Sequence, residues 1–267
     1  MAAFSYFAFT AAFVTLGIAL LSYLWATVGQ QKRAGRVATV FSYNSAALLT
    51  ASLGTRWIAA GHAPYSNQFE FATSFAWGTL ATYLYLELKY RLKSLGVVVI
   101  AVAFGMLVYA STLPARIDPL IAALQNNILI LHVGSAIISY GAFASAFGAG
   151  LLYLINRDDR VAWLPPREVL DEIGYKAIII AFPAQAMLLI LGAVWAHTAW
   201  GRYWGWDPKE TAALVTWLIA AIYLHARAQR GWHGTRTAII LIGLFGAVLF
   251  TFFGNLFLGG LHAYSGL

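Results

Sequence analysis

The sequence contains no cysteine and, for its length, very few charged residues. The absence of cysteine excludes disulfide bonds, thiolate metal sites and a cysteine nucleophile in this chain. Only 10% of the 267 residues are charged, whereas a soluble domain has roughly 25%. A water-soluble fold of this size has too little polar surface for such a composition, so most of the chain is expected to lie in lipid.

The sequence consists largely of long apolar runs, and 61% of its residues are hydrophobic. A transmembrane helix needs about 20 mainly apolar residues. The runs predict an all-α, polytopic transmembrane helical bundle of about eight helices, with spans at 4–28, 38–60, 69–88, 94–112, 128–155, 173–196, 208–226 and 237–258. The first run has no basic region before it and is too long for a signal-peptide core, so we expect it to be retained.

The net charge of +7 does not indicate a nucleic-acid partner, because the basic residues lie in short clusters between apolar runs. The clusters are Lys32, Arg33 and Arg36; Lys89, Arg91 and Lys93; Arg157, Arg160 and Arg167; and Arg227, Arg230 and Arg236. They follow the first, third, fifth and seventh spans. By the positive-inside rule these connections are cytoplasmic, which predicts that both termini face outward.

The six histidines are distributed unevenly over this topology. Four are near the outer ends of spans: His62, His132, His197 and His262. His225 is near an inner end, and His233 is in a cytoplasmic connection. Ionisable residues at membrane depth are costly and usually functional. One interfacial histidine needs no function beyond a backbone hydrogen bond, but four on one face indicate a site.

The outer segment at about 195–211 is rich in aromatic residues: Trp195, Trp200, Tyr203, Trp204 and Trp206. An aromatic belt at the membrane interface is one interpretation. The other is a shelf for a large planar ligand, because Gly201 and Gly205 between the rings would permit close approach. The residues alone leave both interpretations open.

The same segment ends in a predicted helix start. Asp207 suits the N-cap, Pro208 the first helical position, and Glu210 the third position of a capping box. Asp207 and Glu210 could instead form an acid–base pair, but both occupy cap positions, which favours the structural role.

The segment WGRYWGWDPKET, residues 200–211, resembles the tryptophan-rich WWD signature of the haem-handling proteins of cytochrome c maturation. Its DPKET ending, followed by TWLIAAIYLHAR, is most similar to the CcsA (ResC) family, the membrane half of the bacterial and plastid cytochrome c synthase. The resemblance extends from GHAPYSNQFEF at Gly61 through LHVGSAIISYGAF to GGLHAYSG, and is least distinctive in the N-terminal third. The two WWD families of the other maturation system fit less well.

The resemblance implies a haem site at the outer face. It assigns His132 and His262 as ligands of haem iron, and the signature residues Trp200, Trp204, Trp206 and Asp207 to haem binding. His225 matches a histidine that binds haem within the membrane, where a CcsB/ResB-type partner would give a second ligand. It lies 17 residues after Pro208, about 26 Å along a helix. No residue is expected to act as a catalytic acid or base.

The other polar residues have weaker assignments. We expect His197 to order the aromatic segment, His62 to belong to outer-loop packing, and His233 to be solvated. Arg56, near an outer end, gives the hypothesis of a haem propionate partner. Glu70 and Glu87 have no predicted role.

The resemblance implies that residues 1–267 form a single transmembrane haem-handling domain in cytochrome c biogenesis. The chain would bind haem b, present it at the outer face and, with its partner subunit, promote thioether attachment to the CxxCH segment of apocytochrome c. It would then be a cytochrome c synthase (haem lyase) subunit. The expected location is a bacterial inner membrane or a thylakoid membrane, with the active face periplasmic or lumenal.

Three alternatives remain open at this stage. A haem exporter or chaperone would share nearly every feature without catalysing attachment. A b-type membrane electron carrier would place paired histidines on facing helices within the bilayer, where only His225 is clearly expected. A purely structural role would tolerate replacement of Trp206 and His132 by alanine without loss of haem.

Overall fold

The computed structural model describes residues 1–262, and every regular element within them is helical. These residues form eight long helices, a short ninth helix and two 3-10 turns. The predicted all-α class with about eight helices is confirmed. Residues 263–266 of the GGLHAYSG segment lie outside the described part. The helices group into two compact units, which we describe in turn.

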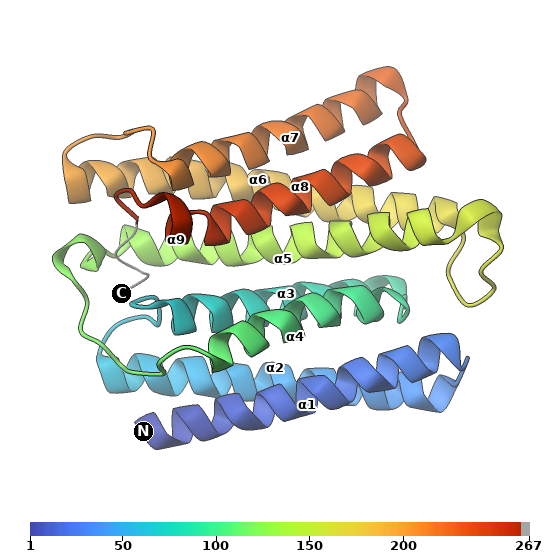
Figure 1. The fold of residues 1–267 in the computed structure, drawn as a ribbon, viewed down its shortest axis with the longest axis horizontal. Coiled ribbons are helices and arrows are strands. Elements are labelled where there is room, and N and C mark those ends of the chain that lie inside the picture. Colours follow the sequence, from blue (N-terminus) through green and yellow to red (C-terminus); the bar gives the residue numbers. More distant parts are fainter. Residues whose placement is uncertain (263–267) are drawn as a thin grey trace. The chain divides into compact units, whose positions relative to one another are not determined.

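Unit 1 consists of residues 1–119 and 161–165 and contains the first four helices (Figure 1). These are α1 (Ala2–Val28), α2 (Lys32–Ala60), α3 (Gln68–Tyr90) and α4 (Leu95–Ser111). Small residues line the contact between α1 and α2, which lets the two backbones approach closely. The Ser45 hydroxyl consequently donates a hydrogen bond to the Ala12 carbonyl oxygen at 3.0 Å.

Unit 2 consists of residues 120–160 and those from 166 onward. It contains η1 (Ala122–Leu124), α5 (Ile128–Ile155), η2 (Arg157–Asp159), α6 (Arg167–Trp200), α7 (Pro208–Arg230), α8 (Thr235–Phe253) and α9 (Asn255–Leu258). Hydrogen bonds cross its interior from the buried Gln185 on α6, whose Oε1 accepts from Ser139 at 2.7 Å and whose Nε2 donates to the Ala213 carbonyl at 3.1 Å. Such bonds hold neighbouring helices together where no water competes.

Five of the described helices, α1, α5, α6, α7 and α8, are long and apolar enough to cross a membrane. Helix α4 is apolar but has 17 residues, and α2 and α3 are long but less apolar. Large apolar side chains such as Phe7, Leu21, Leu88 and Ile190 are exposed, which suits a surface solvated by lipid. The chain is a multi-pass membrane protein. Spanning by all eight long helices stays a prediction.

Several helix boundaries differ from the predicted spans: α2 begins at Lys32 and not at 38, α7 continues to Arg230 and not to 226, and α6 and α8 differ as well. Helix α6 begins at Arg167 and continues to Trp200, beyond the expected range of 173–196, because it ends only where Gly201 adopts a left-handed conformation (φ 75°). The last span was expected to reach 258, but α8 ends at Phe253 and a separate turn, α9, follows. Hydropathy marks the apolar part of a helix and not its caps, which explains these differences.

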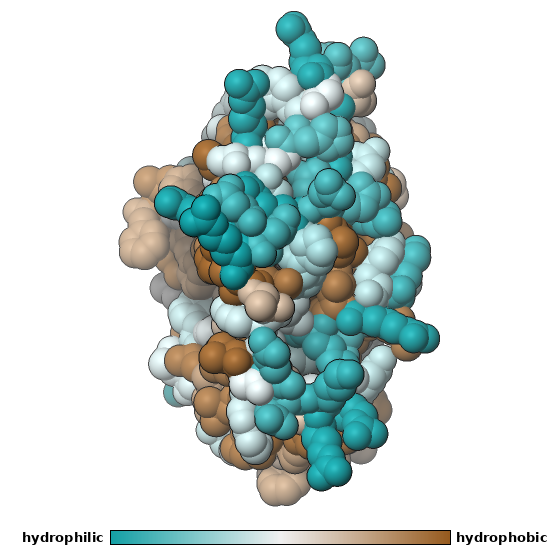
Figure 2. Space-filling model, turned by 90° about the vertical axis from the view of Figure 1, so that its right-hand side faces the viewer, coloured by the Kyte–Doolittle hydropathy of each residue, from teal (hydrophilic) through white to brown (hydrophobic). Residues whose placement is uncertain are grey.

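The connections that carry the basic clusters lie at one end of each unit. In Figure 1 these are the α1–α2 and α3–α4 turns of unit 1 and the α5–α6 and α7–α8 connections of unit 2. Figure 2 looks onto this side, where hydrophilic side chains gather. Arg33, Arg91, Arg160 and Arg230 are all exposed. This arrangement suits the predicted orientation, although the outward position of the termini stays a prediction.

Candidate functional site

Three segments that are distant in the sequence meet at one end of unit 2, opposite its basic connections (Figure 1). They are the start of α5, the connection between α6 and α7, and residues 255–262. This arrangement brings His132, Trp200, Asp207 and His262 into one cluster. It thus places four of the predicted site residues together.

The α6–α7 connection is held by the predicted capping box at the start of α7. Asp207 is the N-cap, Pro208 occupies the first turn, and the Asp207 side chain accepts from the Lys209 backbone N–H at 2.9 Å. The Glu210 carboxylate accepts in return from the backbone N–H groups of Asp207 (3.1 Å) and Gly205 (2.8 Å). The structural role predicted for Asp207 and Glu210 is therefore confirmed.

Asp207 has a second role that the sequence did not predict, because it also anchors His262. Its Oδ1 lies 2.9 Å from Nδ1 of His262, and its Oδ2 accepts from the Leu261 backbone N–H at 2.6 Å. Gly260 permits this approach, since a Cβ at that position would lie 2.3 Å from Oδ2 of Asp207. Gly260 also has φ +106°, a backbone conformation that residues with a side chain rarely adopt.

The environment of this pair fixes its charge. Burial raises the pKa of the Asp207 carboxyl, but the hydrogen bonds from His262 and from the backbone of Lys209 and Leu261 outweigh that effect and lower it to about 2. Burial lowers the pKa of His262 below its usual value, although the bond to Asp207 partly opposes this. At neutral pH an ionised carboxylate therefore faces a neutral imidazole. Because the carboxylate can only accept, the imidazole proton is on Nδ1 and the lone pair is on Nε2.

His132 is held by backbone instead of by a charged group. Its Nδ1 lies 2.9 Å from the Leu188 carbonyl oxygen of α6, which fixes the proton on Nδ1 and the lone pair on Nε2. The ring packs directly against the α6 backbone at Gly192. A Cβ on Gly192 would lie 2.8 Å from Cε1 of His132, closer than any ordinary contact.

Trp195 connects the two histidines. Its ring, which is 1% exposed, has its centroid 6.1 Å from that of His132 and 5.5 Å from that of His262. The indole N–H donates to the Ala123 carbonyl oxygen of η1 at 2.8 Å. Trp200 completes the contact, with centroid distances of 4.7 Å to Trp195 and 4.9 Å to His262. Both predicted iron ligands therefore border the same indole ring.

The remaining aromatic side chains of the connection are more open. Trp204 and Trp206 meet edge to face, with an interplanar angle of 89°. Trp206 is 70% exposed and has φ +56°, a left-handed conformation that is strained for a bulky residue. The indole nitrogen of Trp204 is buried and has no hydrogen-bond partner among the described residues. His197 stacks on Tyr203 at 4.2 Å, as expected for a residue that orders this segment.

An apolar groove borders the start of α7. Its lining comes from α7, α8 and α9: Pro208, Thr211, Ala212, Val215, Ala247, Phe250 and Leu258. The cluster therefore has an apolar surface next to its polar anchor, Asp207.

His225 is not part of this cluster. It lies near the C-terminal end of α7, far along the helix from the capping box, and its side chain is exposed. Its neighbours Tyr223 and Arg227 are buried, so His225 occupies a different face of α7. An iron-binding role for His225 stays a prediction.

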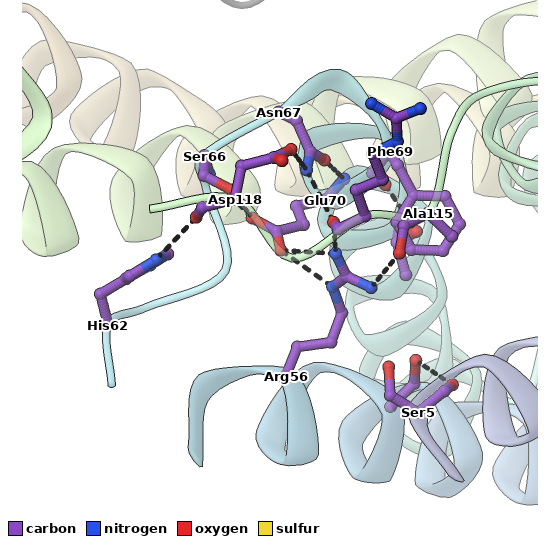
Figure 3. Close-up of polar contacts among 12 residues, drawn as sticks. Ser5, Arg56, His62, Ser66, Asn67, Phe69, Glu70, Ala115 and Asp118 are labelled. Carbon is purple, nitrogen blue, oxygen red and sulfur yellow. Dashed lines mark hydrogen bonds and ion pairs between the residues drawn. The ribbon is translucent and has the colours of Figure 1, made fainter. Parts of the chain in front are cut away.

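Arg56 belongs to a separate polar network in unit 1 (Figure 3). The side chains of Arg56 and Glu70 point toward each other, with 2.8 Å between NH2 and Oε1, and are 1% and 0% exposed. The guanidinium also donates to the backbone oxygens of Ala115 (3.1 Å) and Arg116. These contacts leave no exposed guanidinium for a propionate, contrary to the hypothesis from the sequence. His62 packs in the same loop region, with Nε2 3.0 Å from the Asp118 carbonyl oxygen.

Glu87, which had no predicted role, is a second buried carboxylate of unit 1. It accepts hydrogen bonds from Tyr23, from Tyr83 at 2.6 Å and from Thr39 at 2.5 Å, and pairs with Lys93 at 3.3 Å. Tyr23 is on α1, Thr39 on α2 and Tyr83 on α3, and Lys93 lies in the turn just before α4. Glu87 therefore joins α1, α2 and α3 to the turn that precedes α4.

Known proteins resemble most of this chain. The family model of the cytochrome c assembly protein matches residues 65–262. The cytochrome c biogenesis protein CcsA of Guillardia theta is 36% identical over 289 residues, which cover 96% of this chain and 94% of the relative. The CcsA protein of Microcystis aeruginosa is 36% identical over 274 residues, covering 81% and 84% of the two chains.

A solved structure shares the fold. The cytochrome c haem lyase CcmF superposes with a TM-score of 0.73 at 18% identity, over 99% of this chain. The present chain spans 50% of that lyase, and at this identity the likeness shows the fold alone. Together, the family match from the loop before α3 to His262 and the two CcsA relatives show that the chain belongs to the cytochrome c assembly protein family and takes part in cytochrome c biogenesis.

Proposed function

We propose that this chain binds haem at the outer end of unit 2 and presents it for covalent attachment to apocytochrome c. The observation that carries the proposal is the meeting of His132 and His262 at Trp195. These histidines come from the start of α5 and from the segment after α9, so only the tertiary fold brings them together. Neutral imidazole is a common axial ligand of haem iron.

The residues present suit haem. Both imidazoles have Nδ1 hydrogen-bonded to an oxygen, which directs the Nε2 lone pair to a metal, as is usual for metal-binding histidines. The exposed ring of Trp206 gives an apolar face for a macrocycle. The buried indole N–H of Trp204 lacks a partner among the described residues, and a polar haem substituent would satisfy it.

The chemistry proposed for bound haem is the addition of two cysteine S–H groups across its two vinyl groups, giving two thioether bonds. The thiols come from apocytochrome c, since this chain has none. The contribution of this chain is to orient the macrocycle, because holding reactants in a fixed geometry can remove several kcal/mol from a barrier. Asp207 and Glu210 hold the aromatic connection and His262, and no residue of the cluster is assigned as an acid or base.

We also propose the wider assignments that accompany this function. The chain acts as a synthase subunit with a CcsB/ResB-type membrane partner, and the substrate is haem b. His225 takes part in a second haem site near the inner face, with its other ligand from the partner. The location is a bacterial inner membrane or a thylakoid membrane, with the cluster at the periplasmic or lumenal side.

The alternative is a chaperone that delivers haem without promoting attachment. The two functions are separated by combining the purified chain and its partner with haem and a CxxCH apocytochrome, and by measuring thioether-linked haem on a denaturing gel. A synthase gives covalent product that falls when His132→Ala or His262→Ala is introduced, while His233→Ala serves as a control. Haem binding without covalent product would leave the chaperone function.

A further inference from the structure

The two imidazoles of the cluster have different hydrogen-bond acceptors at Nδ1. His262 faces the ionised carboxylate of Asp207 at 2.9 Å, whereas His132 faces the neutral backbone carbonyl of Leu188, also at 2.9 Å. A hydrogen bond to a charged acceptor is roughly twice as strong as one to a neutral acceptor. It also draws the proton away from the ring and raises the basicity of the nitrogen that binds the metal.

We infer that Asp207 makes His262 the permanent axial ligand of haem iron and leaves His132 as the exchangeable one. This inference rests on the proposed haem site. Asp207 is a positioning residue in it, since it acts on iron only through His262. The incoming histidine of a CxxCH segment would then replace His132: one iron–nitrogen bond breaks, one forms, and no electrons are transferred.

The surroundings of each histidine support this difference. Asp207 is held in place by the backbone N–H groups of Lys209 and Leu261, and its side chain is 2% exposed. The His262 ring is therefore attached to the rigid start of α7. His132, in contrast, has packing against the bare backbone at Gly192 and one bond to a carbonyl that already belongs to the α6 helix. Both rings also lie beside Trp195, so the two histidines differ mainly in the charge of the group that accepts from Nδ1.

Carbon monoxide tests which ligand leaves. Added to the reduced haem of the full chain, purified with its partner, it replaces one axial ligand, and its C–O stretching frequency reports the electron donation of the ligand that remains. We expect Asp207→Asn to raise this frequency, because asparagine is uncharged but still serves as an N-cap. Gly192→Ala, whose added Cβ meets His132 and leaves the Asp207–His262 bond in place, should leave the frequency unchanged. The reverse pattern, or no response to Asp207→Asn, overturns the inference.

A second approach covers the case in which Asp207→Asn loses haem. The variants His132→Ala and His262→Ala each retain one imidazole, and resonance Raman spectra of the reduced proteins give the iron–histidine stretching frequency. We expect a higher frequency in His132→Ala, which retains the Asp207–His262 pair, than in His262→Ala. Adding Gly260→Ala to His132→Ala should lower the frequency, because the new side chain displaces Asp207. Equal frequencies would overturn the inference alone. Absence of haem from the unmodified protein would overturn both the inference and the proposed function.

Discussion

Gly192 determines the position of His132, because the imidazole occupies the space of a missing side chain on α6. A Cβ there would lie 2.8 Å from Cε1 and 3.0 Å from Nδ1 of His132. Overpacking of this kind costs about 1–3 kcal/mol. We therefore expect Gly192→Ala to displace the ring and to lower haem affinity by about tenfold, a change equivalent to about 1.4 kcal/mol.

The measurement for Gly192→Ala is a haem titration of the purified variant followed by absorption. Gly243→Ala is the matched control, since a Cβ at Gly243 on α8 meets no atom within 4 Å. Equal affinities in the two variants would contradict the packing argument.

At this scale the sequence predicted which residues matter better than how they are held. His132 and His262 could be named from a motif, and the cap residues Asp207 and Glu210 from local rules. The bond between Asp207 and His262, the contact of His132 with Gly192 and the central place of Trp195 join segments far apart in the chain. No local pattern contains such contacts, so they could not be predicted without the fold.

The capping box at the start of α7 is the element on which the aromatic connection depends. The Glu210 carboxylate holds two backbone N–H groups, those of Gly205 and Asp207. Removal of a cap interaction typically costs about 1 kcal/mol. We expect Glu210→Ala to lower the free energy of unfolding in detergent by that amount and to make the α6–α7 connection more accessible to protease.

Thermal unfolding and limited proteolysis of the 201–207 connection measure this effect. Glu168→Ala is the control, because Glu168 is also in the first turn of a helix, α6, but is exposed. The same loss of stability in both variants would mean that the charge near the helix start, and not the capping box, is responsible.

Helix existence was predictable at the scale of elements, and helix ends were predictable only where a cap motif exists. The start of α7 agrees with prediction because Asp207 and Pro208 mark it locally. The end of α6 does not, because hydropathy declines before the backbone conformation changes at Gly201. That difference places Trp200, like Trp195, on helix α6, where both rings contact His262.

Unit 1 has its own electrostatic framework, and the Arg56–Glu70 pair is its most buried part. Removing one partner of a buried pair is strongly destabilising, by about 3–5 kcal/mol, because it leaves the other charge unpaired. We expect Arg56→Ala to reduce the thermal stability of the protein severely. The double variant Arg56→Met/Glu70→Leu should be more stable than Arg56→Ala, since neither charge remains, and a double variant that is less stable would contradict this explanation.

The predicted orientation can be tested because the chain has no cysteine. A single cysteine introduced at Arg202, in the α6–α7 connection, should react in intact cells with a thiol reagent that does not cross the membrane. One at Arg230, at the end of α7, should react only after the cells are permeabilised. Labelling with the opposite sidedness would reverse the topology and place the cluster at the cytoplasmic face.

For the whole molecule, composition and apolar runs were sufficient to predict a helical membrane protein. They did not show that the chain forms two compact units, or that buried carboxylates hold unit 1 together. Glu70 and Glu87 are single charges near span ends in the sequence. Their function as helix anchors depends on partners from other helices, which hydropathy cannot identify.

At the end of unit 2, His132 and His262 are proposed to bind one haem. The most direct measurement is the absorption spectrum, oxidised and reduced, of the purified protein beside His132→Ala, His262→Ala and the control His233→Ala. We predict a low-spin haem spectrum in the unmodified protein and in His233→Ala, and loss of haem or conversion to high spin in both other variants. Low-spin spectra that are unchanged in His132→Ala and His262→Ala would contradict the site.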